Sequence, residues 1–286
     1  MTNNYSEYYD QIQEYNIIDD LFFHKVMEDA GAAEELLQII LGDKSIKVIS
    51  CTPQYSLRNI GNRSVVLDLL CEDADGRFFN VEIQQADNTD HQKRMRYHIS
   101  NLDTRITEKG VDFADLPEVF SIMISKFDIF KLGKTVYHID RVLREKGSVE
   151  DNGVHEIYVN ATGNDKSEVT ELMQYVLDSN GFDPRFPRIS SRVQYFKQDN
   201  GGTRGMGKTI AELRAEGRAE GLAEGMEKGI AKGMEKGMAK GIQKGMAKGM
   251  EKGMAKATAE VLKNLGISQE EYRAILKSKA AKQKAD

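Results

Sequence analysis

Cysteine is scarce in this chain of 286 residues, and long apolar runs are missing altogether. The two cysteines, Cys51 and Cys71, lack the spacing of metal ligands and are too few for a disulfide framework, so we expect a reducing environment. No apolar stretch approaches the roughly 20 residues that cross a bilayer, and the first residues lack the basic start and apolar core of a signal peptide. These absences predict a cytoplasmic protein without a membrane partner.

The common catalytic and nucleotide-binding motifs are also missing. The sequence contains no GxGxxG, GxxxxGK(S/T), HExxH or GxSxG motif. The stretch GMGKT at 205–209 lacks the first glycine of a phosphate loop, and no apolar strand precedes it. The five histidines are scattered and have no cysteine partners, which argues against a zinc site. Any chemistry must therefore come from a different arrangement of side chains.

Charge is distributed unevenly along the chain. Residues 201–286 contain 18 Lys and Arg against 11 Asp and Glu, a net charge of +7. The first 200 residues contain 22 basic and 34 acidic residues, a net charge of −12. An acidic body argues against broad affinity for a polyanion, whereas the basic tail could supply some. Clustered acidic residues are also what a metal-dependent site requires.

The stretch LDLLCEDADGRFFNVEIQQ, residues 67–85, predicts two strands joined by a tight turn. Residues 65–71 are rich in Val and Leu, and residues 78–85 alternate between apolar and polar side chains. The Asp-Ala-Asp-Gly sequence between them is typical of a turn, because Gly76 can adopt a positive φ without strain.

The length of that turn decides which residues of the two strands face each other. A three-residue loop ending at Gly76 sets Asp68 opposite Glu82, with Cβ atoms roughly 4.5–5.5 Å apart and like charges that repel. A two-residue loop sets Asp68 opposite Ile83 instead. In the first register a divalent cation would turn the repulsion into ligation, since Mg²⁺ takes one or two carboxylates together with waters and phosphate oxygens. The alternative is a solvated acidic hairpin.

The other elements expected before residue 200 complete a mixed α/β core. Residues 17–41 predict two helices broken at Gly31. The run VFSIMIS has the continuous apolar character of an interior strand. The full set is a polar helix at 91–109, the interior strand at 119–125, further strands at 135–143 and 154–161, and an amphipathic helix at 167–178.

Residues 217–256 consist of ten tetrads that each begin with glycine, and Leu, Met or Ile follows in nine of them. On a straight helix a stripe of period four drifts about 40° per tetrad, so it stays on one partner only if the helices coil in a right-handed sense. Ten glycines cost roughly 8–10 kcal/mol against alanine in a helix. Two interpretations stay open: a helical segment for association, including with a second copy of the chain, and a mostly mobile tail.

These patterns predict five segments along the chain. The segment after the repeat fits two short helices with a basic tip, and the second of them begins with a capping box formed by Ser268 and Glu271. The segments are an N-terminal extension at 1–14, the α/β domain at 15–200, a linker at 201–216, the glycine tetrad repeat at 217–256 and the short helices at 257–286.

Asp68 and the later Glu82-x-Gln84 resemble the PD-(D/E)xK nuclease signature, with Gln in the place of Lys. The context extends the resemblance over about residues 15–200, through DDLFFHKVM, LDLLCEDADGRFFNVEIQ, KRMRYHISNLDTRITEKGVDFADLP and VFSIMISKFDIF. With its glycine tetrad tail, the chain resembles the Rpn family of recombination-promoting nucleases, also called PD-(D/E)xK nuclease family transposases.

The resemblance implies a restriction-endonuclease-like core, with a mixed central sheet flanked by helices, that cuts DNA with Mg²⁺, or Mn²⁺ as a substitute. Asp68 and Glu82 match the metal carboxylates of the family, and Asp20 matches an acidic residue that supplements the metal site. Gln84 matches the third motif position, where it could orient a water molecule. A neutral amide lends no positive charge to the reacting phosphate, so we expect slow or substrate-dependent cleavage. Asp20 also fits the simpler role of a helix N-cap.

Arg94, Arg96 and Tyr97 match the basic and aromatic stretch that follows the hairpin in the family, and the resemblance makes them DNA-binding residues. The simpler interpretation is a solvated helix face. Two competing functions stay open for the whole chain. One is a non-catalytic interaction protein that acts through its repetitive tail, and the other is a transposase that also joins strands. The second is less expected because the sequence has no helix-turn-helix or zinc-finger signature.

Overall fold

The computed structural model of the chain describes residues 8–57 and 63–282. Contacts between residues divide the chain into two compact units, Met1–Glu212 and Leu213–Asp286. The first unit contains the sheet and all of the predicted site residues, and the second contains most of one long helix and the helix that follows it.

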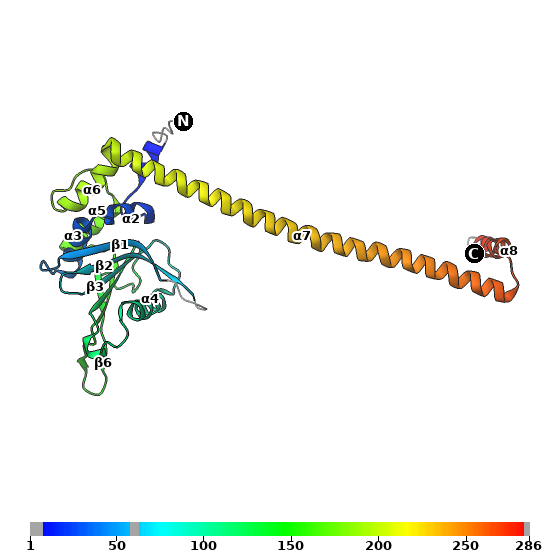
Figure 1. Cartoon of the computed structure of the whole chain (residues 1–286), viewed down its shortest axis with the longest axis horizontal. Coiled ribbons are helices and arrows are strands. Elements are labelled where there is room, and N and C mark those ends of the chain that lie inside the picture. Colours follow the sequence, from blue (N-terminus) through cyan, green and yellow to red (C-terminus); the bar gives the residue numbers. More distant parts are fainter. Residues whose placement is uncertain (1–7, 58–62, 283–286) are drawn as a thin grey trace. The chain divides into compact units, whose positions relative to one another are not determined.

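The first unit is organised around a six-stranded mixed sheet with the order β1-β2-β3-β4-β8-β5 (Figure 1). The strand β2 is antiparallel to both of its neighbours, β1 and β3, while β3, β4 and β8 are parallel, and β5 pairs antiparallel to β8 at the edge. Their bounds are Val48–Leu57 (β1), Val65–Asp73 (β2), Phe78–Gln84 (β3), Val119–Ser125 (β4), Val136–Ile139 (β5) and Val154–Asn160 (β8). A separate two-stranded sheet joins β6 (Val142–Leu143) to β7 (Ser148–Val149).

Helices cover both faces of the sheet, which confirms the predicted fold class. The face toward α2, α3, α5 and α6 carries the main apolar core, and α4 packs on the opposite face against Met123 and Tyr158 (Figure 1). The helices are α1 (Tyr9–Glu14), α2 (Asp20–Met27), α3 (Ala30–Leu41), α4 (His91–Ile106), α5 (Glu168–Leu177) and α6 (Pro187–Gln198), with a 3-10 turn, η2, at Phe113–Asp115.

The turn between β2 and β3 is the three-residue loop, and Gly76 adopts φ 78° in it. The amide of Asp73 donates to the carbonyl of Arg77 at 3.1 Å, and the amide of Gly76 donates back to the carbonyl of Asp73 at 3.0 Å. The register runs from Glu72 opposite Phe78 to Leu69 opposite Val81. The paired residues end there, and continuing the register by one residue sets Asp68 opposite Glu82, so the two carboxylates come from opposed positions.

Two expected boundaries differ from the structure. The break between the first two helices lies at Glu28 and Asp29 rather than at Gly31, which belongs to the first turn of α3. Asp29 starts that helix because its side chain accepts a hydrogen bond from the amide of Ala32 at 3.0 Å. The expected strand at 135–143 is split into β5 and β6, which belong to different sheets.

The chain after α6 is helical sooner and for longer than expected. Residues 201–216, expected as a linker, form the first turns of α7 (Asn200–Leu265, 66 residues). Met206 and Ile210 of this segment are buried in the main apolar core of the first unit. The glycine tetrads lie within α7 and are therefore helical in the structure. The domain limits proposed from the sequence remain a prediction.

A single short helix, α8 (Gln269–Lys282), follows α7, where the sequence suggested two. Its capping box is present: the amide of Glu271 donates to Ser268 Oγ at 3.2 Å, and the amide of Ser268 donates to Glu271 Oε2 at 2.8 Å. Within the part of the chain that the structure describes, no helix is both long and apolar enough to cross a membrane.

Candidate active site

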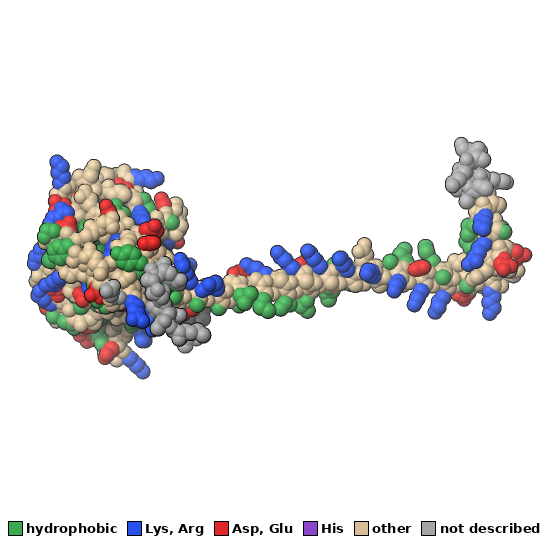
Figure 2. All heavy atoms as spheres, turned by 90° about the horizontal axis from the view of Figure 1, so that it is seen from above, with side chains coloured by type: hydrophobic (Ala, Val, Ile, Leu, Met, Phe, Trp, Pro, Cys, Tyr) green, Lys and Arg blue, Asp and Glu red, His purple; other side chains and the backbone are tan. Residues whose placement is uncertain are grey.

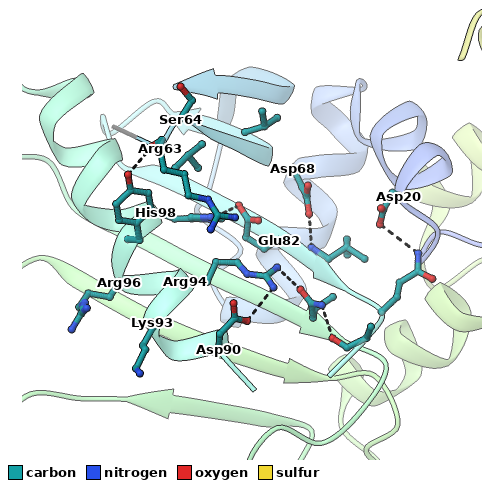
Figure 3. Close-up of a pocket in the computed structure, with 17 residues that line it drawn as sticks. Asp20, Arg63, Ser64, Asp68, Glu82, Asp90, Lys93, Arg94, Arg96 and His98 are labelled. Atoms are coloured by element: carbon teal, nitrogen blue, oxygen red, sulfur yellow. Dashed lines mark hydrogen bonds and ion pairs between the residues drawn. The ribbon is translucent and has the colours of Figure 1, made fainter. Parts of the chain in front are cut away.

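One pocket of about 900 Å³ brings together all seven site residues predicted from the sequence (Figure 3). It lies where β2 and β3 meet the first turns of α4 and the start of α2. The seven are Asp20, Asp68, Glu82, Gln84, Arg94, Arg96 and Tyr97. Residues up to 77 positions apart in the sequence therefore share one cavity, although this placement alone does not establish their roles.

Asp68 is anchored at one wall of the pocket by the strand beside it. Its Oδ2 accepts a hydrogen bond from the amide of Ile83 at 2.8 Å, so this carboxylate takes a backbone donor of β3 (Figure 3). Its Oδ1 lies 3.7 Å from His24 Nε2. The Asp68 side chain keeps 25% of its surface exposed, which leaves it accessible from the pocket.

Glu82 lies on β3 beside Asp68 and is almost fully buried, with 5% of its surface exposed. Burial raises the pKa of the Glu82 carboxyl, the nearby charge of Asp68 raises it further, and the contact with His98 lowers it. His98 Nδ1 lies 3.1 Å from Glu82 Oε1. Neither of these two atoms has a hydrogen bond of good geometry to any described residue. A buried carboxylate oxygen in that state is open to a further partner.

Gln84 is held by two short hydrogen bonds. Its Nε2 donates to the carbonyl of Ala86 at 2.5 Å, and its Oε1 accepts from Arg94 Nη1 at 2.5 Å. Arg94 Nη2 also donates to Asp90 Oδ1 at 3.2 Å (Figure 3). The guanidinium of Arg94 is therefore fixed beside Gln84 and brings a positive charge next to the neutral amide.

Asp20 is the first residue of α2 and does not act as its N-cap, so that alternative from the sequence is wrong. The N-cap position belongs to Asp19, whose carboxylate accepts instead from the amide of Asn16 at 2.9 Å. Asp20 lies at the opposite end of the pocket from the basic residues, where its Oδ1 accepts from Gln85 Nε2 at 3.4 Å (Figure 3).

Basic and aromatic residues form the other side of the pocket. Arg96 and Tyr97 are exposed on α4, and Tyr97 Oη donates to the carbonyl of Arg63 at 2.6 Å. Lys93 and Arg63 line the same side (Figure 3). The predicted basic stretch of α4 thus lines the same cavity as the carboxylates: Arg94 bonds to Gln84, whereas Arg96 and Lys93 point away from Asp68 and Glu82 (Figure 3).

The pocket supplies some, but not all, of the ligands that the sequence predicted for a small hard cation. Asp68 and Glu82 offer two neighbouring carboxylates, which is as many as a protein site for Mg²⁺ commonly supplies. Glu82 Oε1, which lies 3.1 Å from His98 Nδ1 but has no hydrogen bond of good geometry, is consistent with such a ligand. However, no group of three or more His, Cys, Asp or Glu placed to hold a metal ion occurs among the residues that the structure describes. Asp20 is therefore not assembled with Asp68 and Glu82 into a three-ligand site.

Two functional candidates were missed from the sequence. His24 and His98 are both buried, and each lies against one of the two carboxylates. A usable signal was present, because each histidine follows a predicted site residue by four positions on the same helix: Asp20 on α2 and Arg94 on α4. Residues four apart share a helix face, so each histidine lies on the side of its helix that carries a predicted site residue.

The mixed sheet with helices on both faces, and a carboxylate pair on two adjacent strands, is consistent with an α/β domain of the PD-(D/E)XK class. The family model described as "PD-(D/E)XK nuclease family transposase" matches residues 21–167, and the chain belongs to this family. A function related to nucleases or transposases follows from this membership.

Comparisons with individual proteins and with solved structures give no further indication of function. The chain is similar to protocadherin alpha-8 of Pan troglodytes, with 27% identity over 161 residues, which cover 50% of this chain. The chain spans 16% of that relative's length, so the similarity carries no assignment of function. No solved structure matches the chain.

Proposed function

We propose that this protein is a metal-dependent DNA endonuclease, with Mg²⁺ as its ion and Mn²⁺ as a substitute. The observation that carries the proposal is the pair of opposed carboxylates, Asp68 and Glu82, in a pocket whose other side is basic. As in the Rpn nucleases that the sequence resembles, cleavage would promote recombination of DNA in the cytoplasm.

Asp68 and Glu82 would hold the ion, and Asp20 would contribute from the edge of the pocket. When bound there, a divalent cation polarises a phosphate oxygen and lowers the pKa of a water molecule. Asp68 is prepared for ligation by the backbone amide of Ile83, which fixes one oxygen and leaves the other facing His24. His98 would likewise position Glu82, because its ring lies against the Glu82 carboxylate and limits how that group can turn.

Gln84 and Arg94 would act on the reacting groups. The two bonds of Gln84 use its carbonyl oxygen and one N–H, and an amide has a second N–H that can orient a water or a phosphate oxygen. Arg94 supplies the positive charge that Gln84 lacks, at a position fixed by Gln84 and Asp90. Fixed positive charge beside a reacting phosphate stabilises the charge that develops in the transition state.

Arg96, Lys93 and Tyr97 would bind the DNA backbone at the entrance of the pocket. Basic side chains contact phosphates without reading sequence, and they position the duplex for cleavage. We also propose that α7 mediates association with a second copy of the chain. Two active sites in one assembly would allow both strands of a duplex to be cut.

A non-catalytic interaction protein is the second candidate. The lack of a three-ligand group among the described residues favours it, because a weak metal site would leave the tail as the functional part. This candidate predicts a folded pocket that binds neither Mg²⁺ nor Mn²⁺.

The test is calorimetric titration of Mg²⁺ and Mn²⁺ into the full chain and its Glu82→Gln variant, paired with nicking of supercoiled plasmid. We expect binding and nicking in the wild type and a loss of both in Glu82→Gln. Glu72→Gln is the matched control, because Glu72 lies on β2 outside the pocket and should behave as wild type. A well-folded wild type that neither binds the ions nor nicks DNA would establish the second candidate instead.

A further inference from the structure

The fold brings the two cysteines of the chain together. Cys51 on β1 and Cys71 on β2 are directly opposed in the antiparallel register. Cα atoms of opposed residues lie about 4.5 or 5.5 Å apart, according to the type of pair, and disulfides span roughly 4.4–6.8 Å. The side chains are also on one face of the sheet, since Cys71 belongs to the main apolar core and Cys51 packs against it. Sequence spacing alone gave no sign of this pairing.

The two thiols differ in access and in acidity. Cys71 is fully buried, whereas Cys51 is partly exposed. The interaction with Cys71 lowers the pKa of the Cys51 thiol, although burial opposes this effect. The same interaction, together with burial, raises the pKa of the Cys71 thiol well above its ordinary value. Cys51 is therefore the thiol that solvent reaches and that ionises first, which is the requirement for an attacking nucleophile.

We propose that Cys51 and Cys71 form a redox modification site, a dithiol that a small-molecule disulfide oxidises to an intrachain disulfide between β1 and β2. The site is separate from the candidate active site and does not depend on the proposed nuclease activity.

The reaction proceeds by two exchanges. The Cys51 thiolate attacks one sulfur of the small disulfide, which forms a mixed disulfide and releases one small thiolate. Cys71 then attacks Cys51 Sγ, the bond to the small molecule breaks, and a second small thiolate leaves. The two protons lost by the cysteines end on the two small thiols. The small disulfide is reduced and the cysteine pair is oxidised by two electrons.

Oxidation would also alter a contact of the helix that carries Asp20. Cys51 Sγ donates its hydrogen to the carbonyl of Met27 at 2.8 Å, at the end of α2. A disulfide has no such hydrogen, so the buried end of α2 would lose this donor. Cys71 lies on the same strand as Asp68, three residues further along.

The experiment is incubation of the reduced, native full-length chain with oxidised glutathione, followed by intact mass spectrometry without reductant. We expect the wild type to lose two hydrogens and to retain no glutathione. Cys71→Ser should trap one glutathione on Cys51, because the second exchange has no thiol. Cys51→Ser should stay unmodified, because Cys71 is buried. Circular dichroism checks that each variant is folded, and Cys71→Ala replaces Cys71→Ser if a buried hydroxyl unfolds the chain.

Three results would overturn the proposal. One is a native wild type that retains glutathione on one or both cysteines, and another is a disulfide between two chains. The third is a native wild type that stays reduced, while the same chain unfolded in guanidinium reacts at both thiols. That unfolded control shows that the reagent was active.

Discussion

His98 is the residue whose position says most about the carboxylate pair. Its ring is buried against Glu82 and lines the pocket, so it limits how the Glu82 carboxylate can turn. Residues that hold a metal ligand in place typically contribute 10- to 100-fold to metal affinity, so we expect His98→Leu to weaken Mn²⁺ binding by about 10-fold. Titration calorimetry measures the effect.

His155→Leu is the control for that variant, because His155 lies near Glu118 outside the pocket. It removes an imidazole that also lies against a carboxylate but is more exposed, with 32% of the side-chain surface exposed against 10% for His98, and it should leave Mn²⁺ affinity unchanged. Equal affinities in His98→Leu and wild type would show that Glu82 needs no such support.

Arg94 is the residue that we expect to compensate for the neutral Gln84. Arg94→Met removes the guanidinium and both of its hydrogen bonds, to Gln84 and to Asp90. Loss of one fixed donor near a developing charge lowers catalysis by on the order of 10²- to 10³-fold, and we expect a nicking rate lower by about 10²-fold. Arg105→Met, at the far end of α4, should nick at the wild-type rate. A fully active Arg94→Met would confine Arg94 to a structural role.

The sequence predicted the carboxylates better than their surroundings. The period of two placed Glu82 and Gln84 on one face of their strand. The turn chemistry left two loop lengths open for Asp68, and the structure shows the three-residue loop, whose register sets Asp68 opposite Glu82. The hydrogen bond between Arg94 and Gln84 could not be predicted, because it depends on how α4 lies over β3. The same holds for the N-cap of α2, which the alternative from the sequence gave to Asp20 and which the structure gives to Asp19.

At the scale of elements, a polar network fixes the start of α5 to β5. Asp165 accepts hydrogen bonds from Thr170 Oγ1 at 2.6 Å, from Ser167 Oγ at 2.7 Å and from the amide of Thr135 at 3.3 Å. These bonds, led by that of Thr170, hold the pKa of the Asp165 carboxyl far below its ordinary value. The charged form of Asp165 therefore stabilises the fold.

This network predicts a stability that depends on pH. The stabilisation is complete above the unfolded pKa of about 4 and is lost as the pH falls toward the lower folded pKa. We expect Asp165→Asn to cost about 1 kcal/mol at pH 7, or roughly 2–4 °C in Tm. The difference in Tm between wild type and variant should shrink by pH 3, which scanning calorimetry at both pH values tests. A difference that stays constant with pH would show that the charge is not involved.

The elements that the sequence placed well are those with a strong period or a closed turn. The interior strand at 119–125 and the helix at 167–178 agree with β4 and α5 within two residues. The single strand predicted at 135–143 is two strands in the structure, because β6 pairs with β7 outside the main sheet. Alternation of apolar and polar residues does not determine the strand with which a segment pairs. The break predicted at Gly31 was wrong, because α3 starts where the side chain of Asp29 accepts a hydrogen bond from the amide of Ala32.

At the scale of the whole molecule, the repeat helix exposes a continuous apolar series. Nine side chains that follow the tetrad glycines, from Leu222 to Met254, are each exposed by 58–72%. Figure 2 shows these apolar side chains on one side of the earlier part of the helix and on the other side later, as a four-residue period requires. Such a series loses exposed apolar area only by contact with a partner, which supports association as the role of this segment.

No contact with the described residues requires glycine at the first position of the tetrads. A Cβ atom added at any of them, from Gly217 to Gly253, would meet nothing within 4 Å. Each glycine costs about 0.8–1.0 kcal/mol of helix stability against alanine, so ten of them weaken the helix for no internal gain. Small residues every four positions let two helix backbones approach closely, and this is the use that we expect here.

Replacing four glycines tests this use directly, because helix stability and association should then change in opposite directions. The Gly229, Gly233, Gly237 and Gly241→Ala variant of the full chain should gain helicity and melt higher in circular dichroism. It should also elute as a smaller species in light-scattering chromatography, since four methyl groups would hold the partner helix away. The matched control changes Ala231, Ala239, Ala247 and Ala255 to glycine, which lowers helicity without adding bulk. An alanine variant that gains helicity and keeps its assembly would remove the glycines from the interface and leave the apolar series as its basis.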